Sequence, residues 1–193
     1  MRIGILGGTF NPIHIGHLIL AEEAVWRLWL DKLIFVPTYI PPHKKMKKKV
    51  GAGDRYRMAC LATRHNQKFK VSRVEIERKR KSYSVDTLRH FRQRYGPNAK
   101  IFFISGSDCL KDLSSWKDIN QVLKLAKFIV ARRPGYSFRK ISNHVKLMPL
   151  TGIAVSSSEL RRRLKQGRSV RYLVPEAVWN YIVRKKLYRK SNQ

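Results

Sequence analysis

Short apolar runs and helical patterns take turns along the whole chain. The apolar runs are typical of buried strands, and they predict strands at residues 2–7, 32–37, 70–76, 100–105, 128–131 and 145–148. Apolar positions three and four residues apart predict helices at 15–30, 54–65, 86–95, 119–125, 156–166 and 175–186. Strands that alternate with helices indicate an α/β fold with a doubly wound, mostly parallel sheet and helices on both faces.

Two of the predicted strands end in glycine. Gly7 and Gly8 close the first strand, and Gly106 follows the strand at 100–105. In open parallel sheets, ligands bind outside the carboxyl ends of the strands. We therefore expect a ligand site at these two turns.

The length of the chain fits one domain. Its 193 residues, of which 43% are hydrophobic, can bury a sizeable core. We predict a single domain over 1–193, in which residues 150–193 form a C-terminal helical part. Charged residues interrupt the longest apolar stretch, 18–30, and Met1 and Arg2 lead directly into a strand. Neither a membrane span nor a signal peptide is expected, and the expected location is the cytoplasm.

Net charge is the unusual quantity of this composition. Lys and Arg number 42 against 12 Asp and Glu, which gives a net charge of +30. Such a field attracts polyanions, whether nucleic acid, membrane surface or nucleotide phosphates. The basic clusters at 78–81, 161–163 and 184–186 are scattered over predicted surface helices and do not form one stripe with aromatic residues. We therefore expect no specific nucleic-acid binding, and at most weak, salt-sensitive binding of polyanions.

The turn after the first strand has the chemistry of a phosphate site. The segment 7–10 (GGTF) opens into a helix, whose first N–H groups and positive dipole attract anions. It matches neither GxxxxGK[ST] nor GxGxxG, and a Gly-Gly turn alone can be only a tight connection. His14 and His17 stand three residues apart at the helix start, so both can face one side. Two imidazoles there can donate hydrogen bonds to the oxygens of a pentacoordinate phosphorus.

GTFNPIHIGH resembles the GxFxPxHxGH signature of the HxGH nucleotidyltransferases, and the chain resembles bacterial nicotinate-nucleotide adenylyltransferases along nearly its whole length. This resemblance implies a Rossmann-like fold. Further matches follow in the family's order: Pro41-Pro42-His43-Lys44, Arg55 and Met58, the segment 82–88 (SYSVDTL), Gly106-Ser107-Asp108, Trp116, Arg133-Pro134-Gly135 and the segment 156–161 (SSSELR).

The resemblance implies which residues surround ATP. They are Gly7, Gly8, Thr9, Phe10, His14, His17, Gly106, Asp108, Arg133, Ser156, Ser157 and Arg161. Of the residues matched to the family, His14, His17, Lys44 and Arg161 are expected to act in catalysis. The helix start at 156–161 would form a second anion pocket, although the same residues also fit an ordinary capping box.

The acceptor side is likewise implied by the resemblance. The residues expected there are His43, Lys44, Tyr83, Ser84, Asp108 and Trp116. An indole face suits stacking against a pyridine ring, while core packing is the other interpretation of Trp116. The run 44–49 is expected to be a solvated loop in which only Lys44 matches the motif.

The departures from the family pattern are few. Asn11 stands where Asp is common, Ser84 for Thr, Val85 for Phe, Ser158 for Thr and Leu160 for Ile. Ser84 keeps the hydroxyl group, whereas Val85 removes an aromatic ring next to the expected acceptor pocket.

The implied reaction transfers AMP from ATP to nicotinate mononucleotide and gives deamido-NAD and pyrophosphate. Nicotinamide mononucleotide and phosphopantetheine are alternative acceptors, and a basic nucleic-acid-binding protein is the alternative of a different class. Both reactants bring their own reacting groups, so direct transfer needs only positioning and charge neutralisation. The chain shows no carboxylate cluster, and Cys60 and Cys109 lack metal-ligand spacing. We expect no protein metal site, Mg²⁺ that arrives on ATP, and a possible homo-oligomer.

Overall fold

The computed structural model describes residues 1–42, 50–107, 113–132, 145–150 and 154–189. The elements follow in this order: β1 (Arg2–Gly8), α1 (Ile15–Arg27), β2 (Lys32–Pro37), α2 (Ala52–Thr63), β3 (Phe69–Val71), α3 (Val74–Glu77), α4 (Ser84–Tyr95), β4 (Lys100–Gly106), α5 (Ile119–Leu125), β5 (Lys127–Arg132), β6 (Val145–Pro149), α6 (Ser157–Lys165), η2 (Arg171–Leu173) and α7 (Glu176–Arg184).

The six described strands form one sheet in the order β3-β2-β1-β4-β5-β6, and every pairing within it is parallel. This confirms the predicted doubly wound α/β fold. Chain order along the sheet reverses between β1 and β4, so the crevice of a doubly wound sheet lies at their carboxyl ends. Gly8 ends β1 there and Gly106 ends β4 there. Both glycine turns of the sequence prediction therefore meet at one edge.

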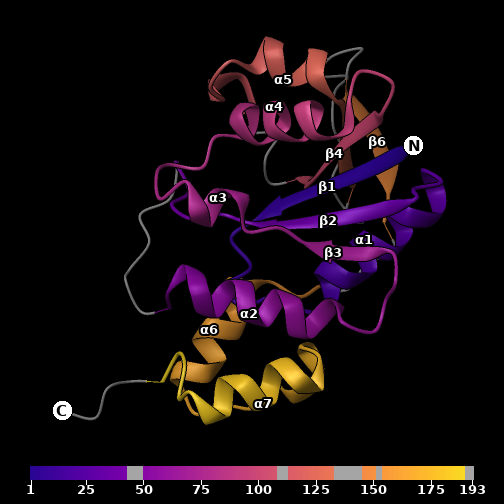
Figure 1. Cartoon of the computed structure of the whole chain (residues 1–193). Coiled ribbons are helices and arrows are strands. Elements are labelled where there is room, and N and C mark those ends of the chain that lie inside the picture. Colours follow the sequence, from indigo (N-terminus) through magenta and orange to yellow (C-terminus); the bar gives the residue numbers. More distant parts are fainter. Residues whose placement is uncertain (43–49, 108–112, 133–144, 151–153, 190–193) are drawn as a thin grey trace.

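Helices cover both faces of the sheet (Figure 1). On one side Ile3 and Ile5 of β1 pack in a core cluster with residues of α4 and α5. On the other side Leu6 of β1 packs with residues of α1, α2, α6 and α7. The alternation along β1 follows from the period of two in a strand, and burial on both faces explains the unbroken apolar runs.

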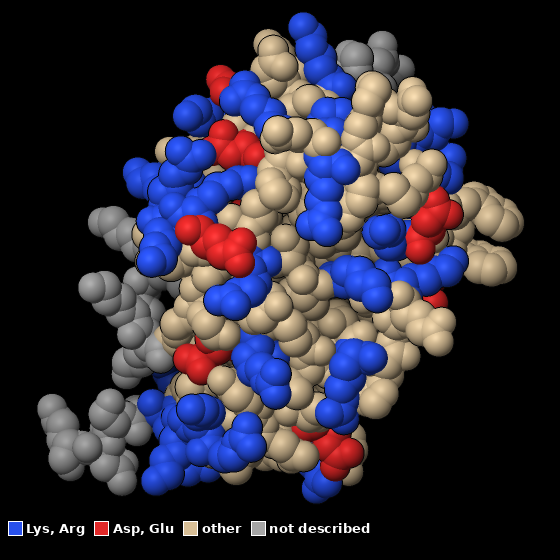
Figure 2. All heavy atoms as spheres, in the orientation of Figure 1, with Lys and Arg blue, Asp and Glu red and all other residues tan. Residues whose placement is uncertain are grey.

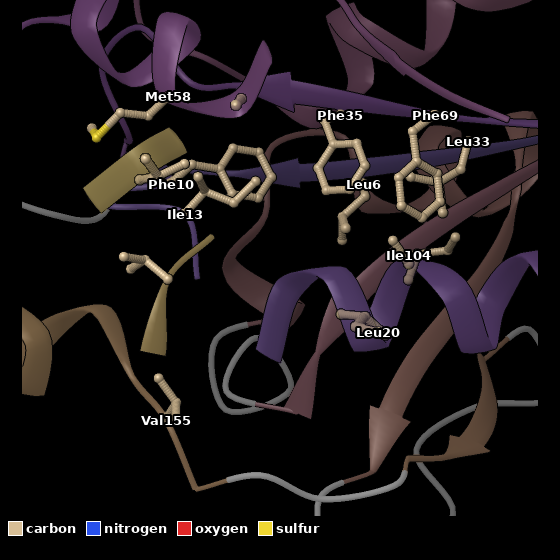
Figure 3. Packing of buried hydrophobic residues seen from close by; sticks show 14 of the residues in the cluster. Leu6, Phe10, Ile13, Leu20, Leu33, Phe35, Met58, Phe69, Ile104 and Val155 are labelled. Atoms are coloured by element: carbon tan, nitrogen blue, oxygen red, sulfur yellow. The ribbon is translucent and has the colours of Figure 1, made fainter. Parts of the chain in front are cut away.

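The loop after β1 is anchored in the second of these clusters. Phe10 and Ile13 are almost fully buried, and Figure 3 shows them beside Phe35 and Met58. The rings of Phe10 and Phe35 lie 5.7 Å apart between centroids. The loop that carries the histidines is thus held by apolar packing and is not a free surface turn.

Two sequence predictions are wrong in part. The predicted strand at 70–76 is the short β3 followed by α3, because the chain turns at Ser72, whose hydroxyl accepts the N–H of Val74. The predicted helix at 15–30 ends at Arg27, since Trp29 adopts a left-handed conformation (φ 50°). Elsewhere, α2 and α4 each begin two residues earlier than predicted, at 52 and 84. Within the described residues no helix is long and apolar enough to cross a membrane.

Gly4 and Gly53 provide a matched test of the packing. A Cβ at Gly4 would lie 2.5 Å from Leu30 Cδ1 and 3.1 Å from Ile104 Cδ1, whereas nothing lies within 4 Å of one at Gly53. Gly4→Ala should lower the free energy of unfolding by about 1–3 kcal/mol. Gly53→Ala, exposed on α2, should raise it by up to about 1 kcal/mol. Urea unfolding measures both, and equal effects would contradict the packing described here.

Candidate active site

The loop between β1 and α1 is shaped by close contacts. A Cβ at Gly8 would lie 3.0 Å from two atoms of the Phe10 ring, so a side chain there would displace Phe10. Phe10 itself adopts a left-handed conformation (φ 48°) and is 2% exposed. Thr38 donates its backbone N–H to Gly8 O at 2.9 Å. The backbone of the loop is therefore fixed where β1 ends.

His14 and His17 lie together at the start of α1. His14 is the N-cap residue, and its ring lies 3.8 Å from that of His17 between centroids. The backbone N–H of His14 donates to His17 Nδ1 at 3.2 Å. An imidazole that accepts at Nδ1 carries its proton on Nε2, so His17 is held as a hydrogen-bond donor through Nε2. Gly16 is needed here, because a Cβ would lie 3.2 Å from two atoms of the His14 ring.

The start of α6 is fastened to the same loop. Ser157 Oγ donates to Pro12 O at 2.9 Å, and Arg161 donates to Asn11 O at 2.7 Å. Ser156 Oγ accepts the N–H of Glu159 at 3.2 Å, which is the capping interaction that the sequence allowed. The fold thus brings the GTFNPIHIGH and SSSELR segments side by side, about 150 residues apart in the chain. The N-terminus of α6 therefore lies against the loop that leads into the N-terminus of α1.

The C-terminal part adds two hydroxyl groups to this corner. Tyr188 Oη donates to Asn11 Oδ1 at 2.7 Å, and Tyr181 Oη of α7 donates to Asp54 Oδ1 of α2 at 2.8 Å. Asn11, at a position where the family commonly has Asp, accepts the first of these bonds. The sequence prediction did not include either tyrosine, because each acts through a partner more than a hundred residues away.

Arg55 is the residue that sequence reasoning missed as part of the site. It is fully buried in α2, and its guanidinium donates to three backbone carbonyls: Thr9 O at 2.8 Å, Thr38 O at 2.6 Å and Tyr39 O at 3.1 Å. Burial lowers the pKa of Arg55, and Tyr188 and Glu75 partly oppose that shift. Arg55 therefore ties the loop after β1 to the loop after β2. A signal existed, because Arg55 lies on the apolar stripe of α2 with Met58 and Ala59.

The acceptor segment, residues 82–88, is joined to the loop after β2. Ser82 Oγ accepts the N–H of Tyr39 at 2.9 Å, and the N–H of Ser82 donates to Ile40 O at 2.9 Å. Tyr83 is then the N-cap residue of α4, and Ser84 is its first residue. Lys117 Nζ lies 4.8 Å from the centroid of the Tyr83 ring. Tyr83 and Ser84 thus stand at a helix start beside the region of Trp116.

Trp116 takes part in the core. Its ring lies edge-on to Phe128 at 5.6 Å and to Phe103 at 6.0 Å between centroids, and the side chain is half-buried. These contacts fit the core interpretation, and the exposed remainder leaves room for the acceptor role, which stays a prediction. Val85 is fully buried in the same cluster, so this departure from the family pattern lies in the core and not on the acceptor surface.

The buried carboxyl group of Glu75 is hydrogen-bonded to the acceptor segment. Glu75 is 5% exposed and accepts the hydroxyl of Thr87 at 2.6 Å. Arg78 donates to the same hydroxyl at 3.2 Å and to Asp86 O at 2.9 Å. Burial raises the pKa of Glu75, and the hydrogen bond from Thr87 acts in the opposite direction. These contacts fix the first turn of α4 against α3.

Of the remaining predicted site residues, the structure describes Gly106 but not the other four. Gly106 ends β4 with open space above its Cα, since no described residue lies within 4 Å of a Cβ placed there. The predicted residues His43, Lys44, Asp108 and Arg133 lie outside the described part of the chain. Within the described residues, no three His, Cys, Asp or Glu side chains are grouped to hold a metal ion.

Comparison with known proteins points to one family. The model of the cytidylyltransferase-like family matches residues 5–163. A probable nicotinate-nucleotide adenylyltransferase from Moorella thermoacetica is 43% identical, over 97% of this chain and 92% of its own. One from Tropheryma whipplei is 44% identical, over 95% and 98%. Among solved structures, the Plasmodium falciparum nicotinic acid mononucleotide adenylyltransferase complexed with NaAD has a TM-score of 0.81 at 20% identity and covers 97% of both chains.

Arg55→Lys tests the link between the two loops. An ammonium group cannot serve three carbonyls in the fork geometry of a guanidinium, and a buried carbonyl left without a donor costs about 1–3 kcal/mol. We expect the free energy of unfolding to fall by about that amount and KM to rise for both substrates. Arg57→Lys, at an exposed position of the same helix, is the control. An Arg55→Lys protein that matches this control in both measurements would contradict the role of Arg55.

Proposed function

Because the chain belongs to the cytidylyltransferase-like family and, within it, to the nicotinate-nucleotide adenylyltransferases, we propose that it transfers AMP from ATP to nicotinate mononucleotide. The products are deamido-NAD and pyrophosphate. The observation that carries this proposal is the union of the α1 and α6 helix starts at the carboxyl end of β1, through the Ser157 and Arg161 contacts to Pro12 and Asn11.

On the ATP side, the two helix starts supply N–H groups and positive dipole ends for the phosphates. His17 donates from Nε2 to an oxygen on the reacting phosphorus, and the His14 ring packs beside the His17 ring. Arg161 keeps its guanidinium against the loop after β1 through its bond to Asn11 O. Gly106 leaves room for the nucleotide to approach the backbone at the end of β4. Gly7, Gly8 and Thr9 belong to the ATP side of the proposal because they lie at the end of β1 and the start of the loop to α1. Lys44, Asp108 and Arg133 belong to the proposal from the family resemblance alone.

The transfer is a direct displacement. An oxygen of the acceptor's phosphate forms a bond to the α-phosphorus of ATP, and the bond from that phosphorus to the bridging oxygen of the β-phosphate breaks. Pyrophosphate leaves with that bonding electron pair, and no protein nucleophile takes part. The protein positions the reactants and stabilises charge on the pentacoordinate phosphorus, and these two effects supply almost all of the catalysis in phosphoryl transfer.

Magnesium accompanies ATP in this proposal. It would be held mainly by phosphate oxygens and water, in keeping with the small number of acidic residues in the chain. Its contribution when bound is to neutralise phosphate charge.

On the acceptor side, the proposal assigns Tyr83, Ser84 and Trp116 to the pyridine end of the mononucleotide. His43, Lys44 and Asp108 are assigned to the acceptor on the family resemblance alone. The support is the position of Tyr83 and Ser84 at the start of α4, where N–H groups suit a carboxylate. A pyridine ring that carries a carboxylate is therefore favoured over one that carries an amide. Nicotinamide mononucleotide is the second candidate acceptor. The cytoplasm and a homo-oligomer stay predictions.

Non-specific attraction of polyanions goes with this function. Lys and Arg side chains are spread over the whole visible face of the molecule, with few Asp and Glu between them (Figure 2). The same field draws ATP and the acceptor toward the site and weakens as salt increases.

His17→Ala tests the catalytic assignment. Loss of one preorganised donor to the oxygens on the reacting phosphorus should lower kcat by about 10²–10³-fold. The free energy of unfolding should fall by no more than about 2 kcal/mol, because the N–H of His14 loses its acceptor at the start of α1. His65→Ala removes an exposed histidine in the turn after α2 and serves as the control. Steady-state kinetics with both substrates give the answer, and a kcat within threefold of the control would remove His17 from the mechanism.

The choice of acceptor is tested by comparing kcat/KM for nicotinate and nicotinamide mononucleotide. We expect a preference of at least about tenfold for the acid, because a carboxylate accepts stronger hydrogen bonds from N–H groups than an amide oxygen does. Equal values, or a preference for the amide, would contradict the proposed acceptor and leave the transfer chemistry intact.

A further inference from the structure

The amino-terminal edge of the sheet, opposite the active site, carries a row of basic residues. Each of five neighbouring strands begins at or directly after one: in sheet order they are Lys68, Lys32, Arg2, Lys100 and Lys127. The pairing of Arg2 with Lys100 places two of them side by side. Strands are about 4.8 Å apart, so the row is roughly 19 Å long. Lys68, Lys100 and Lys127 are exposed.

Two tryptophans stand exposed beside this row. Trp26 is 72% exposed and Trp29 is 74% exposed, although apolar side chains of this size are normally buried. Their rings are stacked, with centroids 6.0 Å apart and an interplanar angle of 26°. The left-handed conformation of Trp29 directs this turn. The hydrogen bonds that build the active site in the described part of the chain use neither ring.

Hydrogen bonds join the tryptophan turn to the basic row. Arg2 Nε donates to Leu28 O at 2.8 Å, and Lys68 Nζ donates to Leu30 O at 3.3 Å. Lys32 Nζ lies 5.2 Å from the centroid of the Tyr95 ring, which adds an aromatic group along the row. The Asp31 carboxylate lies in the same place and accepts the N–H of Arg2. Basic and aromatic residues that are far apart in sequence thus form one surface.

We propose that this surface, formed by the basic row with Trp26 and Trp29, binds single-stranded nucleic acid without sequence specificity. Stacking of bases on exposed aromatic rings beside cations that contact phosphates is how sequence-tolerant single-strand binding works. Charge decides among the possible occupants, because a second copy of the chain would bring another +30 to the same face. An uncharged apolar partner would make no use of the row.

The surface lies at the amino ends of the strands, while the candidate active site lies at the carboxyl ends. Bound nucleic acid therefore leaves adenylyl transfer unaffected. This makes catalysis an independent check of folding in every variant, and it separates this proposal from the proposed function.

The test is fluorescence anisotropy of a labelled oligouridine with the full chain and Trp26→Ala/Trp29→Ala. The double variant should raise Kd at least about tenfold, because stacking contributes strongly for each base. Tyr172→Ala removes another exposed aromatic side chain, 87% exposed beside Arg171, and should leave Kd unchanged. Both variants should keep wild-type adenylyl transfer. Equal Kd for the two variants would overturn the proposal.

The basic row has its own matched pair. Lys100→Gln/Lys127→Gln should reduce the slope of log K against log salt by about 1.4, since two phosphate contacts are lost. Lys165→Gln/Arg168→Gln removes the same charge from the last residue of α6 and the turn after it and should change the slope much less. Equal changes in slope would show that nucleic acid responds to the overall positive charge and not to the basic row, and would overturn the proposal.

Vesicles of phosphatidylglycerol distinguish a membrane from nucleic acid. Both ligands are anionic, and tryptophan also favours membrane interfaces. We expect vesicle binding to be equal in the wild type and the tryptophan variant. Loss of vesicle binding in that variant without loss of oligouridine binding would overturn the proposal in favour of a membrane surface.

Discussion

The buried guanidinium of Arg55 is the interaction on which the site depends most. Its bonds to Thr9 O, Thr38 O and Tyr39 O hold together the ends of β1 and β2. The first loop leads to the histidines, and the second is bonded through Ser82 to the acceptor segment. A side chain with several fixed donors is required, because both loops present carbonyls to a place that water does not reach.

Around the hydrogen bonds of Arg55, the site is assembled from distant parts of the chain. Ser157 and Arg161 bring α6 to the loop after β1, and Tyr188 reaches the same loop from near the C-terminus. The parallel sheet makes this possible, because all its strands point their carboxyl ends toward one edge. The starts of the strands, and with them the basic row, lie at the opposite, amino-terminal edge of the sheet.

Regular periodicity made most of the fold predictable from sequence. The strand at 70–76 was mispredicted because Val74 and Ile76 continue an apolar alternation although the chain has already turned at Ser72. The histidine pair and the SSSELR helix were predictable because they are local motifs. For Arg55, its place on the apolar stripe of α2 indicated burial but not its bonding partners. These partners and the basic row were not predictable, since each depends on which elements become neighbours. Basic residues that are scattered in sequence become a row only through the strand order.

The central claim is that the two loops joined by Arg55 hold both reactants for one direct transfer. Exchange of labelled pyrophosphate into ATP in the absence of any acceptor tests it most directly. Direct transfer predicts no exchange above the rate without enzyme, because the bond from the α-phosphorus to the leaving oxygen breaks only when the acceptor's phosphate attacks. Rapid exchange without an acceptor would show an adenylylated protein and contradict direct transfer.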